Sequence, residues 1–162
     1  MTTTRDLRVR PDLLYAASGW NVLITDVHGR VTGADPHGFY ARNTRVVSQE
    51  QVTVNGRSPQ VFSMANIGVH AQQSYAILDH NDDLPSTATY LVTEHFLGEG
   101  MRTRLTVLSY ADRPRTWAMR VAFDGDFADI DDVQSGQSRP RVQHHFRSNR
   151  QPRLRSLNSF AV

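Results

Sequence analysis

The sequence predicts an all-β fold, an antiparallel β-sandwich, followed by a disordered basic tail. Short runs of apolar and β-branched residues recur at hairpin spacing, and glycine, proline, asparagine and aspartate lie between them. Several of these runs alternate apolar with polar residues at period two. No segment keeps a helical period, which favours a sandwich or a barrel over a mixed fold.

The first predicted hairpin begins with residues 20–25, an apolar and β-branched run. His28-Gly29 is expected to form its turn, and Val31-Thr32 to begin the return strand. Residues 5–15, which precede this hairpin, have no decisive pattern and stay unassigned.

A second hairpin is predicted around Asn55-Gly56, the favoured pair for a type I′ turn, in which both central residues need positive φ. Residues 46–54 lead into this turn, and the apolar pattern resumes at Val61-Phe62. The strand that ends at Val54 is therefore expected to pair with the strand that follows the turn.

Four further strands are expected at 69–78, 87–97, 101–110 and 117–123. The polar residues 79–85, which end in a proline, are expected to form a loop, and 98–100 and 112–114 are expected to be turns.

The basic residues are unevenly distributed. All 18 are arginine, and six of them lie in residues 139–162, which hold none of the 16 acids. We therefore assign one domain to 13–134 and a disordered, arginine-rich tail to 135–162. The tail lacks the interleaved aromatic residues of a nucleic-acid stacking surface, so no nucleic-acid partner is expected.

The absence of certain residues and motifs excludes several classes of protein. The chain contains no cysteine, which excludes disulfide bonds, thiolate zinc sites and a cysteine nucleophile. It has no secretory signal and no membrane-spanning apolar run, so we expect a cytoplasmic protein without a membrane partner. It also lacks a P-loop and a G-x-G-x-x-G motif, and no cofactor is expected.

No catalytic residue and no metal site can be assigned from the pattern. The acidic residues 124–132 do not match an EF-hand loop, because Ala128, Asp129 and Ser135 occupy its fifth, sixth and twelfth positions. A calcium site of another kind is the alternative to a solvated loop that Phe127 and Ile130 anchor to the core. The scattered histidines, His28, His37, His70, His80 and His95, are interpreted as surface or packed residues.

Aromatic residues offer a possible carbohydrate-binding surface. Trp20 and Tyr40 are the candidates for stacking against sugar rings, with Tyr90 and Trp117 as further members of a platform. The alternative is that these residues pack in the core, and the period-two position of Trp117 favours the core for that residue.

Three stretches together resemble the N-terminal domain of bacterial and archaeal glycogen-debranching enzymes. Residues 38–45 (GFYARNTR) resemble the family's signature, in which aspartate usually stands in place of Asn43. Residues 54–57 (VNGR) resemble the hairpin that follows it, and 123–129 (FDGDFAD) resemble a later stretch. Residues 97–102 and 105–112 stand where the family has its central hairpin, and the likeness covers about 13–134.

The resemblance implies a β-sandwich that packs against an (α/α)-barrel glycoside hydrolase domain, where an acid and a base perform amylo-α-1,6-glucosidase chemistry. No catalytic residue carries over, since the barrel would follow the matched part. The resemblance gives a structural or interface motif, whose members are Gly38, Phe39, Tyr40, Arg42, Asn43, Thr44, Arg45, Asp126, Phe127 and Asp129. Its loop at 38–45 is either a buried arginine–polar network or a surface that faces the catalytic domain.

Three functions are compatible with the sequence. The first is a non-catalytic accessory domain in a truncated or frameshifted chain, because the composition changes abruptly near Ser138; a natural stand-alone domain with a disordered arm is the alternative to truncation. The second is a stand-alone α-glucan-binding module. The third is a small hydrolase that uses Asp126 and Asp129.

Overall fold

The computed structural model describes residues 10–78, 88–110, 115–136, 144–148 and 159–161, the last two segments as backbone strands. The prediction of an all-β fold is confirmed: every strand pair in the described residues is antiparallel. The one helix of the described residues is α1 (Ile130–Gln134).

The strands form three sheets. The four-stranded sheet has the order β1 (Leu13–Ser18), β2 (Asn21–Asp26), β3 (Gly38–Ala41) and β4 (Thr44–Val47). The three-stranded sheet has the order β11 (His144–Ser148), β10 (Met119–Gly125) and β5 (Gln49–Val54). The five-stranded sheet has the order β12 (Ser159–Ala161), β9 (Met101–Ser109), β8 (Thr89–Leu97), β7 (Ala71–Ile77) and β6 (Gln60–Gly68).

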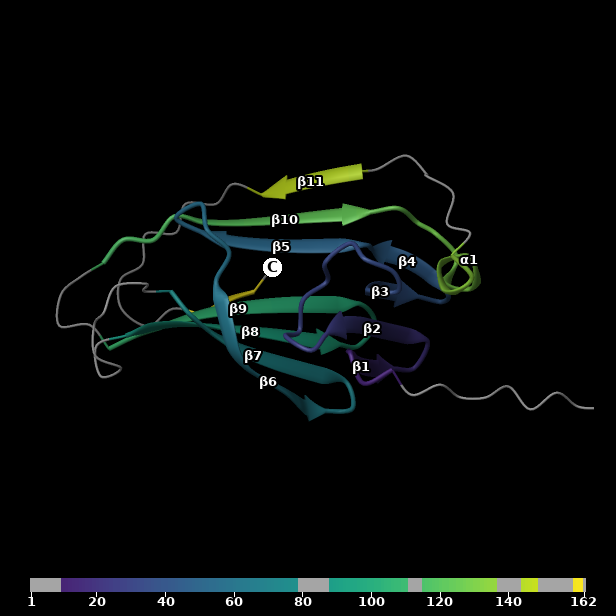
Figure 1. The fold of residues 1–162 in the computed structure, drawn as a ribbon, viewed down its shortest axis with the longest axis horizontal. Coiled ribbons are helices and arrows are strands. Elements are labelled where there is room, and N and C mark those ends of the chain that lie inside the picture. Colours follow the sequence, from purple (N-terminus) through teal and green to yellow (C-terminus); the bar gives the residue numbers. More distant parts are fainter. Residues whose placement is uncertain (1–9, 79–87, 111–114, 137–143, 149–158, 162) are drawn as a thin grey trace, which may run out of the picture.

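Two sheets cover one face of the five-stranded sheet (Figure 1). Val54 of β5 belongs to a core cluster with Ala76, Leu91 and Leu105 of the five-stranded sheet. Leu97 of β8 belongs to a second cluster, formed with Ala16, Leu23, Val31 and Phe39. The result is a sandwich in which the four-stranded and three-stranded sheets lie side by side over the same partner.

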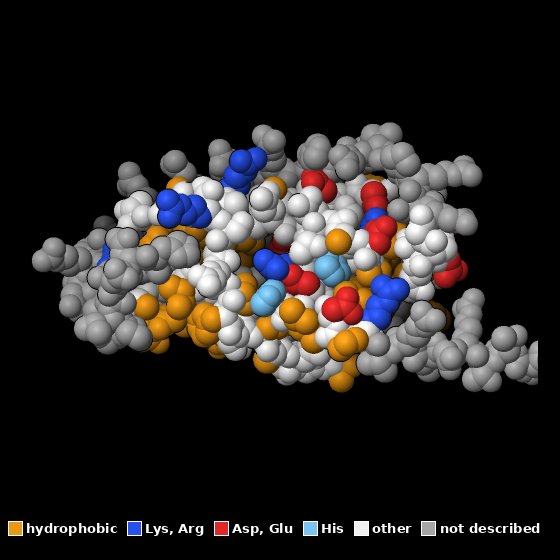
Figure 2. Space-filling view, viewed as in Figure 1, with side chains coloured by type: hydrophobic (Ala, Val, Ile, Leu, Met, Phe, Trp, Pro, Cys, Tyr) orange, Lys and Arg blue, Asp and Glu red, His pale blue; other side chains and the backbone are white. Residues whose placement is uncertain are grey.

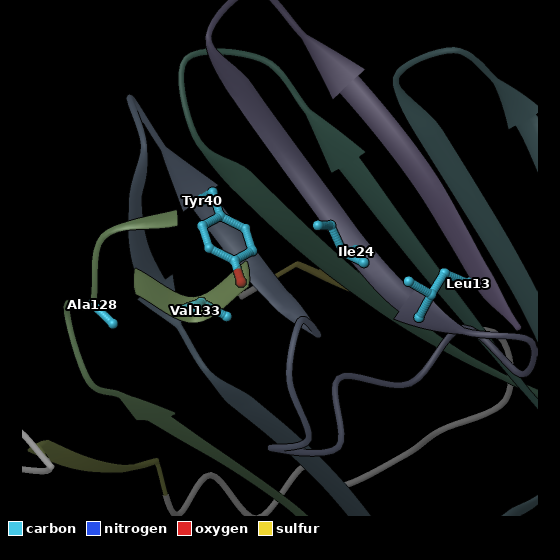
Figure 3. Close-up of a cluster of buried hydrophobic side chains, with 5 residues drawn as sticks. All are labelled: Leu13, Ile24, Tyr40, Ala128 and Val133. Carbon is cyan, nitrogen blue, oxygen red and sulfur yellow. The ribbon is translucent and has the colours of Figure 1, made fainter. Parts of the chain in front are cut away.

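The four-stranded sheet is also covered on its other face. Leu13, Ile24 and Tyr40 point from its strands towards Ala128 and Val133, and Val133 lies in α1 (Figure 3). Because both faces of this sheet are buried, consecutive residues such as Phe39 and Tyr40 both belong to a core.

The predicted pairing across Asn55-Gly56 is wrong, although the turn itself forms. Asn55 and Gly56 have φ values of 51° and 77°, and Val54 and Arg57 exchange backbone hydrogen bonds of 2.8 and 3.0 Å. However, β5 pairs with β10 and β6 pairs with β7. Asn55 binds Ala118 through its backbone and its side chain, which extends the pairing of β5 with β10.

The predicted hairpin around His28-Gly29 is half correct. The turn is present, since Asp26 and Arg30 are hydrogen-bonded across it. The return strand is wrong, because Val31 and Thr32 pair with residues of β5 instead of β2. The strands on either side of β2 are β1 and β3, and β1 begins inside the segment that the sequence left unassigned.

The four later strands are confirmed as β7, β8, β9 and β10. The expected loop at 79–85 and turn at 112–114 lie outside the described residues. In the tail expected to be disordered, the structure assigns two strands, β11 and β12, and the rest of 137–162 lies outside the described residues. No helix in the described residues is long and apolar enough to cross a membrane.

Candidate functional site

The two most distinctive motifs of the sequence lie against each other. Residues 38–45 form β3, a tight turn and β4, and the turn residues Arg42 and Asn43 have φ values of 48° and 70°. Residues 127–130 run beside β4: Arg45 exchanges backbone hydrogen bonds with Phe127 and Ala128, and the Ile130 N–H donates to Asn43 at 2.8 Å. The fold therefore joins segments that are more than 80 residues apart.

Arg45 is the centre of this junction. It is 3% exposed, and its Nε donates to both carboxylate oxygens of Asp126 at 3.0 and 3.1 Å. Its second terminal nitrogen also pairs with Asp126, and its first donates to Asp35 at 2.6 Å. Fork-shaped pairing of this kind fixes orientation as well as charge, so Arg45 holds two loops onto β4.

The charge state of Asp126 follows from these contacts. Burial by itself would raise the pKa of Asp126, but the hydrogen bonds from Arg45 and Ala128 and the charge of Arg45 outweigh burial and lower this pKa. Asp126 is therefore ionised at neutral pH, which does not suit it to act as a general acid.

Two glycines allow the segments to approach this closely. A Cβ on Gly38 would lie 2.7 Å from Cδ of Arg45, and a Cβ on Gly125 would lie 2.4 Å from the carbonyl oxygen of Val46. Both distances are too short for a side chain at either position. The glycines of the two motifs are therefore explained by packing.

Asp129 performs a local structural role. Its side chain accepts a hydrogen bond from the Asp131 N–H at 2.9 Å and caps the N-terminus of α1. Since Asp126 binds Arg45 and Asp129 caps a helix, the two carboxylates do not face a common substrate space. The geometry gives no support to a hydrolase built on this pair.

Tyr40 does not lie at the surface. It is 1% exposed, and its hydroxyl donates to the Pro36 carbonyl at 2.8 Å. Burial raises the pKa of Tyr40 to about 12. The proposed stacking of Tyr40 against sugar is therefore wrong, because β3 is covered on both faces.

The exposed side of the junction is formed by turns. The Arg42 N–H donates to the Trp20 carbonyl at 3.1 Å, which places the β1–β2 turn beside the β3–β4 turn. Trp20 is 81% exposed and Phe127 is 40% exposed, while Arg42 and Asn43 are also exposed. Of the two carbohydrate candidates, only Trp20 offers a ring to solvent.

His95 and Glu50 form a second polar site, which was not predicted from the sequence. Nε2 of His95 lies 2.7 Å from Oε2 of Glu50, and both side chains are 4% exposed. Burial by itself lowers the pKa of His95, but the charge and the hydrogen bond of Glu50 outweigh it and raise this pKa. The signal was available: His95 is in phase with the inward-facing Leu91 and Leu97 of β8, so alternation alone predicts its burial.

No metal centre is assembled in the part of the chain that the structure describes. No three histidine, aspartate or glutamate side chains there come together as ligands. Two aspartates of the acidic segment already have protein partners, Arg45 and the N-terminus of α1.

A comparison with protein families agrees with these motifs. Residues 18–158 match the family described as the N-terminal domain of (some) glycogen debranching enzymes. The match continues beyond residue 134, the end of the resemblance expected from the sequence. No curated protein matches the chain. The chain therefore belongs to the family of N-terminal domains of glycogen debranching enzymes.

Proposed function

We propose that this chain is a non-catalytic accessory domain that packs against an (α/α)-barrel catalytic domain of a glycogen-debranching protein. The observation that carries the proposal is an exposed apolar surface beside the family's signature turn. The carboxylates of the signature motifs serve the fold, which is consistent with a role that leaves the chemistry to another domain.

The surface lies where several turns meet at one end of the sandwich. We define the turn-end surface as Tyr15, Trp20, Ile67 and Val69, which are 49%, 81%, 48% and 80% exposed. The Ala17 N–H donates to Val69 at 2.8 Å, and the Asn66 amide donates to Tyr15 at 3.3 Å, so the β6–β7 turn is held against β1. Hydrophobic side chains are visible along the lower edge of Figure 2, over the five-stranded sheet.

An exposed tryptophan is a typical anchor of a protein interface. We therefore expect Trp20 to contribute more to docking than any other residue of the turn-end surface. The signature turn, bonded to Trp20 through Arg42, would then lie at the edge of the interface.

The test is binding of the full chain to the separately expressed barrel domain of a debranching enzyme, measured by calorimetry. Trp20→Ala should weaken the complex about tenfold or more, as expected for an interface anchor. Tyr110→Ala is the matched control, because Tyr110 is 59% exposed but lies with Phe62 and Tyr90 in an aromatic cluster away from the turn-end surface. No complex, or an equal loss in the control, would contradict the proposal.

We also propose that the chain is a truncated form of a longer debranching protein, which can be tested on the gene. Sequencing through the codons for Ser138 and downstream should find barrel sequence in another reading frame. The family match extends through residue 158 in the present reading frame, which argues against a frameshift at Ser138 itself. Downstream sequence with no barrel in any frame would leave a stand-alone accessory domain.

The exposure of Trp20 also favours a second candidate function, an α-glucan-binding module. In this case maltooligosaccharides should bind the chain without a barrel domain, and Trp20→Ala should abolish the heat of binding. Tyr40→Ala does not test this idea, because Tyr40 is buried.

A further inference from the structure

The strand β6 forms a free edge of the five-stranded sheet (Figure 1). Among the described residues, β7 is the one strand that pairs with β6, and no backbone hydrogen bond joins β6 to another segment. In an antiparallel pair, every second residue points its N–H and C=O away from the partner strand. The outer side of β6 therefore carries a row of backbone donors and acceptors that no described residue pairs with.

Other edges of the sandwich are covered or short. Residues 127–128 are bonded to β4, and Val31 and Thr32 are bonded to β5. The Val69 carbonyl accepts a hydrogen bond from β1. At the remaining edges, β11 and β12 have five and three residues, whereas β6 has nine. In the part of the chain that the structure describes, β6 is therefore the longest edge strand, and it lacks such a cover.

The composition of β6 leaves this edge open to another strand. Exposed edge strands are commonly protected from pairing by a charged residue or a proline. β6 (QVFSMANIG) contains neither, although 21% of the residues of the chain are charged. Bulges interrupt β6 near both ends, but residues 63–66 between them pair regularly with β7. This regular stretch can therefore accept a further antiparallel strand on its outer side.

An apolar surface adjoins the edge on the outer face of the sheet. Phe62 is 56% exposed, and its ring centroid lies 6.4 Å from that of Tyr75 and 5.9 Å from that of Tyr90. Because the neighbouring Ala76 and Leu91 belong to the core, alternation places Tyr75 and Tyr90 on the outer face. A strand added beside β6 would therefore cover apolar surface as well as pair backbone groups.

A second copy of this chain fits the edge because β6 is compatible with itself. Since β6 has no charged residue, pairing it with its own copy brings no like charges together. Paired residues of antiparallel strands share a face, so a two-fold axis centred on residues 63–66 passes beside Met64 or Ala65. One such contact uses the free edge of both copies, and the assembly therefore closes at two.

We propose that this chain forms a two-fold symmetric dimer in which residues 63–66 of β6 pair with the same residues of a second copy. The two five-stranded sheets then form one continuous sheet, and Phe62 of each copy lies beside the join. Trp20, the anchor proposed for the barrel domain, lies in the β1–β2 turn of another sheet, so the dimer does not depend on docking to a barrel.

The test is sedimentation equilibrium of the full chain from about 10 to 500 µM, with a dissociation constant expected on the order of 50 µM for a small interface. Ala65 is exposed, and Ala65→Lys and Ala65→Glu should each weaken the dimer about fivefold or more, because each places like charges near the two-fold axis. An equimolar mixture of the two variants should recover the wild-type association, which also shows that both variants are folded.

Trp20→Ala and Tyr110→Ala are the matched controls, because each removes an exposed aromatic ring outside β6. Both should dimerise as the wild type does, which separates edge pairing from association through other apolar side chains.

Amide hydrogen exchange locates the contact. Amides within residues 63–66 should exchange more slowly at the highest protein concentration than at the lowest, and this difference should disappear in Ala65→Lys. The proposal is overturned by a wild type that stays monomeric at the highest concentration, or by a dimer that Ala65→Lys does not weaken. It is equally overturned by a variant mixture that does not associate, or by concentration-dependent protection of another strand instead of β6.

Discussion

At Arg45, one guanidinium group reaches carboxylates that come from two different loops. Asp35 precedes β3, whereas Asp126 follows β10, and the two meet only because Arg45 is buried between them. The side chain therefore connects the four-stranded sheet to the end of the three-stranded sheet. Its contribution to stability should be large, because removal leaves Asp126 near the core without its partner.

Arg45→Ala should lower the free energy of unfolding by about 3 kcal/mol, the lower end of the range for breaking a buried ion pair, since both carboxylates keep some exposure to solvent. Urea unfolding followed by tryptophan fluorescence measures this change. Arg102→Ala is the control, because Arg102 is an exposed arginine on β9 and its loss should cost less than about 0.5 kcal/mol. Equal effects in the two variants would show that the buried network adds nothing.

His95 gives the fold a dependence on pH. Since its pKa in the folded protein is raised above about 6.5, the stabilisation from its pairing with Glu50 is fully present below that pH. It is lost as the pH rises through the pKa of the folded state. The urea midpoint of the wild type should therefore fall above neutral pH, and that of His95→Gln should not follow it. A parallel decline in both proteins would assign the effect to other groups.

Among the structural elements, the end of β10 shows how closely the two motifs are packed. Gly125 leaves no space for a side chain, because an added Cβ would lie 2.4 Å from a carbonyl oxygen of β4. This oxygen belongs to the backbone and cannot swing away. The contact fixes how far β10 can approach β4 before the chain turns into α1.

Gly125→Ala should destabilise the protein by about 2 kcal/mol or more, as expected for overpacking against backbone. Gly98→Ala is the matched control, because a Cβ on Gly98 would have no atom within 4 Å. Thermal unfolding of the two variants compares them directly. A similar melting temperature for both would mean that β4 and β10 adjust more easily than the packing indicates.

Elements with local signals were predictable from the sequence. The turn at Asn55-Gly56 was found because asparagine and glycine adopt positive φ without help from distant residues. The partner of the strand before that turn was not found, since β10 lies more than 60 residues further on, and its choice depends on burial against the five-stranded sheet.

The candidate site was predictable in part for the same reason. The motif residues were identified from the sequence, but the pairing of Arg45 with Asp126 depends on an approach between distant segments. Tyr40 was misplaced because period two carries no information in a strand that is covered on both sides. The burial of His95 was predictable from the alternation of β8, but its pairing with Glu50 was not, because Glu50 lies in another sheet.

At the scale of the whole molecule, the sandwich depends on pairings between distant segments. Among the described residues, β10 is the strand that pairs with β5, and Asp126 follows it. Removing this region would leave the hydrogen-bonding edge of β5 without a partner strand and leave Arg45 without its main partner. We therefore expect that residues 1–110 do not fold independently of β10.

A fragment of residues 1–110 should show no cooperative unfolding and a poorly dispersed NMR spectrum, because it lacks β10. The fragment 1–148 is the control, since it keeps β10 and β11 and lacks only β12 among the described strands. It should retain a cooperative transition. A well-dispersed spectrum from 1–110 would show that the four-stranded and five-stranded sheets are sufficient for folding.

A single residue, Ser48, connects β4 to β5. This short connection restricts which sequence changes the protein can accept during evolution. Arg45 pairs with Asp126 at the junction and Glu50 pairs with His95 of the five-stranded sheet, and the number of residues between Arg45 and Glu50 decides both orientations. A substitution at Ser48 alters one side chain, whereas an inserted or deleted residue rotates every later residue of β5 to the opposite face. Evolutionary descendants of this sequence should therefore carry substitutions at this position but no insertion or deletion.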